Sequence, residues 1–248
     1  MDETANAVRP PRGSPLGFES WARDIASAIA CSLNPPPFPD DALPRGADRT
    51  VLMIPGFLAG DWTMTRLRQF LESLDYRVEP SGVDFNLGPT SRLMTQLGAR
   101  LLALSAERGK LALIGQSLGG VLARSLARRH PEAVCHVVTL CTPIRFPITT
   151  PLEPFARLLS PLHDPDWLAE RDAIAAPLPI PVTAIYSQTD GIVDWRQCVQ
   201  DAAPGQENLR IDGAHSAMGS NPQAQRAIAQ VLGRCAREGA AVTAKCGS

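Results

Sequence analysis

The stretch from Leu111 to Arg129 constrains the fold of this chain more than any other. It begins with a short apolar run of branched residues, which is typical of a buried β-strand. Its second half, from Val121 onward, is rich in Leu, Ala and Arg, which favour a helix. Residues 115–120 lie between the two and read Gly-Gln-Ser-Leu-Gly-Gly. The sequence therefore predicts a strand that turns sharply into a helix at a Gly-x-Ser-x-Gly motif.

Ser117 lies at the apex of this predicted turn. A sharp strand-to-helix turn forces its apex residue into a strained, near-left-handed backbone and leaves the side chain exposed. The positions two before and two after must be small, and Gly115 and Gly119 meet that need. An exposed serine in such a turn is typical of a nucleophile. The same residues also fit an ordinary glycine-rich turn, so the functional interpretation depends on the rest of the chain.

Strands and helices alternate along the chain. We expect strands at 50–54, 76–82, 111–116, 134–140, 181–186 and 206–211. Helices are expected between them, including one capped by Asp61 and a last one from Asn221 to about Arg237. This order predicts an α/β fold: a three-layer α/β/α sandwich with a mostly parallel, doubly wound sheet.

The expected domain organisation has three parts. Residues 1–47 form an N-terminal tail and a helix with Trp21, Ile25, Ile29 and Leu33 on one face, which is either a surface helix or a flap. Residues 48–240 form the main domain, and 241–248 a C-terminal tail. Within the domain, residues 143–180 are rich in proline and apolar residues. We interpret them as a small cap over an apolar pocket, the alternative being a long loop.

The composition limits the classes of partner. A formal net charge of −1 gives no support for binding nucleic acid or an anionic membrane, and no apolar run approaches the roughly 20 residues of a transmembrane helix. The acidic N-terminus does not resemble a secretory signal, so a cytoplasmic location is expected. The six cysteines lack metal-site spacing and should be buried free thiols, the alternative being a disulfide that involves Cys31, Cys235 or Cys246. No metal and no organic cofactor is indicated.

A histidine and an acid follow Ser117 in the chain. Of four histidines, only His215 lies in a small-residue loop after the last predicted strand, and only it follows both Ser117 and the candidate acid. Asp190 comes directly after a strand, before a glycine. Asp194 is its rival and would otherwise cap the next helix. The order Ser117, Asp190, His215 is that of a serine, acid and base catalytic triad on this type of sheet.

Two backbone amides are candidates for an oxyanion hole. Residues 55–60 form a glycine-punctuated loop after the first strand, which offers the N–H of Phe57. The N–H of Leu118, directly after the candidate nucleophile, is the second. The loop also fits a tight turn with no catalytic role.

The chain resembles the α/β-hydrolase superfamily, and more closely its compact lipase and esterase members. The resemblance covers about residues 48–238 and is carried by the following segments: Ile54–Phe57, Gly115–Gly120, Tyr186–Val193 and Gly213–His215. It implies Ser117, Asp190 and His215 as the triad, because the matching Ser-x-x-Asp-x-Ile-Val pattern carries the acid at Asp190. The oxyanion loop begins Pro-Gly rather than His-Gly, and the resemblance does not extend to residues 143–180, so it implies no particular substrate.

The expected function is a serine hydrolase that cleaves small apolar acyl esters through an acyl-enzyme on Ser117. Two alternatives remain open. One is an acyltransferase or thioesterase with the same triad, and the other is a non-catalytic binding protein on this fold. The sequence does not indicate the oligomeric state.

Overall fold

Six parallel strands form one sheet, in the order β2-β1-β3-β4-β5-β6. The computed structural model describes residues 16–39 and 42–246. Every neighbouring pair is parallel, as predicted. The strands are β1 (Thr50–Ile54), β2 (Arg77–Pro80), β3 (Leu111–Gln116), β4 (Val134–Leu140), β5 (Val182–Tyr186) and β6 (Gln206–Arg210).

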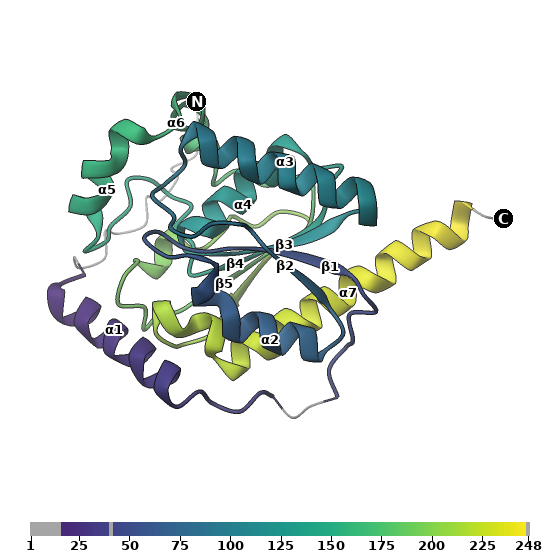
Figure 1. The fold of residues 1–248 in the computed structure, drawn as a ribbon, viewed down its shortest axis with the longest axis horizontal. Helices are drawn as coiled ribbons and strands as arrows, with labels where there is room; N and C mark the ends of the chain where they lie inside the picture. Colours follow the sequence, from purple (N-terminus) through teal and green to yellow (C-terminus); the bar gives the residue numbers. More distant parts are fainter. Residues whose placement is uncertain (1–15, 40–41, 247–248) are drawn as a thin grey trace, which may run out of the picture.

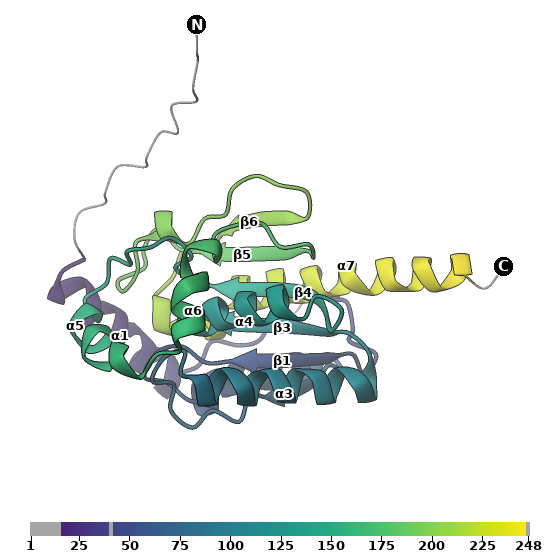
Figure 2. The same ribbon diagram turned by 90° about the horizontal axis from the view of Figure 1, so that it is seen from above.

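Helices cover both faces of the sheet (Figures 1 and 2). On one face α3 (Ser91–Arg108) and α4 (Leu118–Arg129) pack on strand residues such as Leu52 and Leu113. On the other, α2 (Thr65–Ser73) and α7 (Pro222–Cys246) pack on alternate strand residues such as Met53 and Ile114. This alternation follows from the two-residue period of a strand. The predicted three-layer α/β/α fold is confirmed.

The segment 143–180 forms short helices beyond the carboxyl end of β4. They are α5 (Glu153–Leu159), η2 (Ser160–Leu162), α6 (Pro165–Glu170) and η3 (Arg171–Ala173). Trp167 is buried and meets Phe146 edge to face, and both belong to or pack on the core cluster beneath α4. The segment therefore packs on the domain, as a cap does.

The N-terminal helix α1 (Phe18–Leu33) has the predicted bounds, but it presents a different face to the domain. Its one buried residue is Asp24, whereas Ile29 and Leu33 are 55% and 82% exposed. A spacing of four residues exceeds one helical turn by about 40°, so the predicted apolar row drifts around the helix. Figure 1 shows α1 and α5 on the same side of the molecule, beyond the carboxyl ends of the strands.

Two expected helix ends differ from the structure. Asp61 does not cap a helix: it lies in η1 (Asp61–Met64), and its carboxylate accepts hydrogen bonds from the backbone of Ser81, Gly82 and Val83. The last helix runs to Cys246 rather than Arg237, because the residues that follow include several good helix formers.

The structure bears on the cysteines and on membrane crossing. Cys31, Cys135, Cys141 and Cys198 are free thiols, and the last two are buried. The side chains of Cys235 and Cys246 lie outside the described residues.

Within 16–39 and 42–246, no helix combines the length and apolar composition that a bilayer crossing requires. The cytoplasmic location stays a prediction.

Candidate active site

Ser117 lies between the last residue of β3 and the first residue of α4, with φ 52° and ψ −124°. This is the left-handed backbone that the motif predicts for a strand-to-helix apex. The approach of strand and helix leaves no room for side chains. A Cβ on Gly115 would overlap the backbone of Gly119, and a Cβ on Gly119 would overlap the Ile54 carbonyl. Close packing of β3, α4 and the end of β1 thus holds the serine at the carboxyl edge of the sheet.

His215 and Asp190 form a buried pair beside this edge. His215 Nδ1 lies 2.7 Å from Asp190 Oδ2, and the two side chains are only 6% and 1% exposed. The other carboxylate oxygen, Oδ1, accepts hydrogen bonds from the amides of Ile192 and Val193, both at 2.8 Å. Asp190 follows β5, and His215 begins η5 (His215–Ser220) after β6. The structure therefore brings together the base and the acid that the sequence nominated.

The pair is electrostatically coupled. Burial acts to lower the pKa of His215, but the charge of Asp190, its hydrogen bond and the charge of Asp24 together raise that pKa above its ordinary value. Burial likewise acts to raise the pKa of Asp190, and the His215 charge with three hydrogen bonds outweighs it, so that pKa is lowered. Asp190 therefore favours protonation of His215, as a base that accepts a proton requires.

Ser117 and His215 are linked through a neighbour rather than directly. The structure describes both residues and shows no hydrogen bond between the Ser117 hydroxyl and the His215 imidazole. The side chain of Gln116 instead donates from Nε2 to the His215 carbonyl at 2.9 Å. Gln116 immediately precedes the nucleophile candidate, so this bond ties the β3 turn to the His215 loop. Catalytic hydrogen bonds are often formed only when substrate is bound.

The amides of Phe57 and Leu118 are both available. Neither donates a hydrogen bond to an acceptor among the described residues. Gly56 lies against the turn, since a Cβ there would lie 3.2 Å from Ser117 Cβ. The loop is held by buried Asn86, whose Nδ2 donates to the Pro55 carbonyl at 2.9 Å. The two candidate donors thus lie in segments that approach each other at Ser117.

A cavity of about 370 Å³ opens at Ser117. Phe57 and Leu118 line its base together with the serine, and the cap forms much of its wall. The lining is mostly apolar and includes Pro89, Phe146, Ile148, Leu152, Trp167, Ile192 and Val193. The charged lining residues are Glu153, Arg157 and Arg171. A cavity with few polar groups suits an apolar ligand.

The alternative acid, Asp194, and the three other histidines do not take part in the His215–Asp190 pair. Asp194 caps η4 (Trp195–Gln197) by accepting from the Arg196 amide at 3.1 Å. His130 ends α4, and His136 is buried in β4 against Thr183, where burial lowers its pKa to about 4. His163 lines the cavity from the cap.

Cys141 adds a third buried group to the His215–Asp190 pair. Its thiol and one ligand atom of each partner lie within 4.8 Å of one another. Burial raises the pKa of Cys141 well above its ordinary value, and the Asp190 charge adds to that rise. The thiol is therefore neutral, and it belongs to the residue directly after β4.

Three supporting residues were missed by the sequence analysis: Asp24, Gln116 and Asn86. Their partners are backbone groups, which every residue carries, so no sequence pattern marks the pairing. The one signal was an acidic residue in the middle of the predicted helix at 18–33, between the small residues Ser20 and Ser27.

Comparisons with known proteins agree with this geometry. The family model of the alpha/beta hydrolase fold matches residues 106–179, a part that holds Ser117 but neither Asp190 nor His215. No curated protein sequence was found to match the chain.

Solved structures match over most of the chain. A monoacylglycerol lipase from Paleococcus ferrophilus matches with a TM-score of 0.54 at 15% identity, over 77% of this chain and 97% of that one. A lipase-esterase related protein from Clostridium acetobutylicum gives 0.54 at 16%, over 77% and 96%. A putative aryl esterase from Burkholderia cenocepacia gives 0.53 at 15%, over 78% and 93%.

At these identities the structural matches establish the fold alone. They agree with the sequence match, which covers the turn at Ser117, and with the parallel sheet of six strands flanked by helices. On these grounds the chain has the α/β-hydrolase fold.

Proposed function

We propose that this chain is a serine hydrolase that cleaves carboxylic esters through an acyl-enzyme on Ser117. The observation that carries the proposal is the buried His215–Asp190 pair, 2.7 Å apart, on loops that end next to the serine turn. A buried imidazole paired to a carboxylate is the base that a serine hydroxyl requires at neutral pH.

Each residue has a role that its surroundings support. His215 takes the proton of Ser117 as the hydroxyl attacks the ester carbonyl, and returns it to the departing alkoxide. Asp190 holds the ring with Nε2 free for the serine and offsets the charge of the imidazolium. The amides of Phe57 and Leu118 stabilise the oxyanion of the tetrahedral intermediate. Water, activated by His215, then releases the acid and restores the serine.

The proposed substrates are small esters with an apolar acyl group. The cavity at Ser117 is lined mainly by apolar side chains, several of them from the cap. Three structural neighbours carry the words lipase or esterase in their names. This likeness supports the reaction class, and the cavity supports the apolar character of the substrate.

A panel of p-nitrophenyl esters with acyl chains of increasing length tests the proposal. We expect turnover by the wild type, labelling of Ser117 by a fluorophosphonate probe, and loss of about 10⁴-fold or more of kcat in Ser117→Ala. Equal turnover by Ser117→Ala, or no turnover and no labelling of the wild type, would contradict it. Formation of a transfer product rather than the free acid, when alcohols or amines are added, would instead indicate an acyltransferase.

A further inference from the structure

We propose that Asp24 of α1 is a positioning residue, which holds the loops of the acid and the base together, so that the N-terminal helix completes the active site. This inference rests on the proposed function. It assigns to residues 18–33 a role in the reaction, although they lie outside the sheet and its crossover connections.

The Asp24 carboxylate contacts both loops. Its Oδ2 accepts hydrogen bonds from the backbone amides of His215 at 2.5 Å and Gly191 at 3.3 Å. Its Oδ1 accepts from the amide of Ser216 at 3.0 Å. One side chain therefore binds the backbone of the base and the backbone of the residue after the acid.

Besides the hydrogen bond between the His215 and Asp190 side chains, further contacts between the two loops lie nearer the strand ends. Near the strand ends, Ser187 Oγ donates to the Gly213 carbonyl at 2.7 Å. Asp24 joins the loops closer to the reacting groups. The amide of Gly191, next to Asp190, and the amide of His215 both donate to the Asp24 carboxylate. Losing it would leave the two loops joined by the His215–Asp190 side-chain bond and by the contacts near the strand ends, without a partner shared by their backbones.

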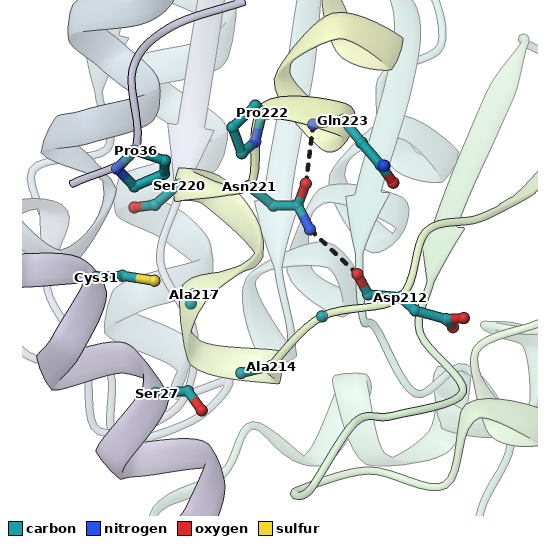
Figure 3. A pocket seen from close by; sticks show the side chains of 11 residues that line it. Ser27, Cys31, Pro36, Asp212, Ala214, Ala217, Ser220, Asn221, Pro222 and Gln223 are labelled. Atoms are coloured by element: carbon teal, nitrogen blue, oxygen red, sulfur yellow. Dashed lines mark hydrogen bonds between the residues drawn. The ribbon is translucent and has the colours of Figure 1, made fainter. Parts of the chain in front are cut away.

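The helix is held at this point by the Asp24 carboxylate, together with a partly buried apolar contact from Trp21. Asp24 is the one buried residue of α1. A hollow of about 470 Å³ lies on one side of it, where Ser27 and Cys31 face Ala214 and Ala217 across open space (Figure 3). Another, of about 500 Å³, adjoins Asp24 and lies between Arg23 and the residues that follow β5. If α1 were attached only by burying apolar side chains, we would expect those side chains to fill these hollows.

The approach of α1 depends on Gly191. A Cβ at that position would overlap the Ser20 carbonyl and lie 3.0 Å from Asp24 Cβ. One turn earlier, Trp21 packs against the cluster of Ile192 and Val193, whose amides hold Asp190. The loop that carries Asp190 therefore packs closely against the face of α1 that carries Trp21 and Asp24.

A carboxylate suits this position better than its amide. An ionised carboxylate has two acceptor oxygens and serves all three amides, whereas an asparagine has one oxygen and turns N–H donors toward at least one of them. The charge also matters. The groups that face His215 are Asp190 from the β5 loop, Cys141 from the end of β4, and Asp24 from α1. Asp24 adds to the rise in the pKa of His215.

Asp24→Asn in the full-length chain tests the proposal, with Glu19→Gln as the matched control. Glu19 is an exposed carboxylate on the same helix. For Asp24→Asn we expect kcat on a p-nitrophenyl ester to fall at least tenfold, with KM within about twofold. We also expect the acid limb of kcat/KM to move to lower pH, because the imidazole loses a neighbouring negative charge. Glu19→Gln should change neither.

Hydrogen exchange gives a readout that does not require turnover. The segments 190–193 and 214–217 should exchange faster in Asp24→Asn than in the wild type, while β3 and α4 stay protected. If the wild type cleaves no ester and this change still occurs, the proposed function fails and the positioning role stands. If the wild type is active and the variant keeps its kcat, its pH profile and its exchange rates, the positioning role is wrong.

Gly191→Ala covers the case in which Asp24→Asn does not fold. It leaves Asp24 intact and prevents the close approach of α1. We expect lower kcat and faster exchange at 214–217. Wild-type kcat and exchange in a folded Gly191→Ala variant would overturn the proposal.

Discussion

The two halves of the proposed active site are built differently. The nucleophile half comes from one continuous stretch, in which β3, Ser117 and α4 follow each other in the chain and lie in the middle of the sheet. The base half is assembled from loops after β5 and β6 at one edge of the sheet, together with α1. Its hydrogen bond from His215 to Asp24 spans 191 residues.

The two halves therefore differ in whether the contacts that position the reacting side chain are mainly local or mainly distant in sequence. The Ser117 backbone is set by its chain neighbours in β3 and α4, and its amide donates to the Leu140 carbonyl of the adjacent strand β4 at 2.8 Å. His215 is set by three contacts, each from a different segment: Asp190, Asp24 and Gln116. We therefore expect substitutions in the base half to change the reaction while leaving the fold intact.

The largest effect on the base half is expected from Asp190→Asn. The amide cannot hold the His215 ring in the required tautomer, so we expect kcat to fall about 10⁴-fold with the protein still folded. The measurement is steady-state kinetics on a p-nitrophenyl ester, with a thermal melt as the check on folding. Asp194→Asn is the matched control and should stay within about twofold of the wild type. A reversed order of the two variants would assign the acid to Asp194.

A smaller effect is expected where the two halves meet. Gln116→Leu removes the hydrogen bond from Gln116 Nε2 to the His215 carbonyl, which is 2.9 Å long. A hydrogen bond contributes about 0.5–1.5 kcal/mol, so we expect kcat to fall by up to about tenfold as His215 loses its alignment with Ser117.

The control is Gln96→Leu, which removes a comparable bond to the Gly82 carbonyl on an exposed part of α3. An unchanged kcat in Gln116→Leu would show that the halves are aligned without this contact. An equal fall in both variants would assign the effect to general destabilisation.

The smallest effect concerns the pH profile of the wild type. His215 acts as a base only when neutral, and Asp190 and Asp24 together raise its pKa despite burial. Activity should therefore be lost as the pH falls through a midpoint above the ordinary histidine value of 6.5. The measurement is kcat/KM against pH, which reports the free enzyme. A midpoint below 6.5 would contradict the coupling, and one near 4 would match the buried His136 instead.

Much of the fold and of the proposed triad was predictable from local patterns. The alternation of apolar runs and helical segments predicted the sheet and its layers, since each pattern reflects which residues leave water. Ser117, Asp190 and His215 were nominated because each follows a predicted strand, and parallel strands place their carboxyl ends along one edge. The choice of Asp190 over Asp194 depended on the same rule, and the pairing with His215 agrees with it.

Predictions from the sequence failed for a polar side chain that could bind the backbone of more than one segment. Asp61 was expected to cap a helix, yet its carboxylate binds the loop after β2. The helix at 18–33 was interpreted as a surface helix or a flap with one apolar face, and its buried residue is instead the carboxylate of Asp24. In each case the sequence showed a polar group or an apolar face without showing which distant segment would meet it.

The candidate triad residues could therefore be identified from local sequence patterns, whereas the contacts that hold them in place depend on the tertiary structure. A glycine-flanked serine between a strand and a helix has few conformations open to it, so its role can be proposed from residues 111–129 alone. Asp24 binds backbone amides, which are identical at every position and leave no trace in the sequence of the loops that carry them. Only the folded chain, by bringing α1 against the ends of β5 and β6, brings that carboxylate to the amides of His215 and Gly191.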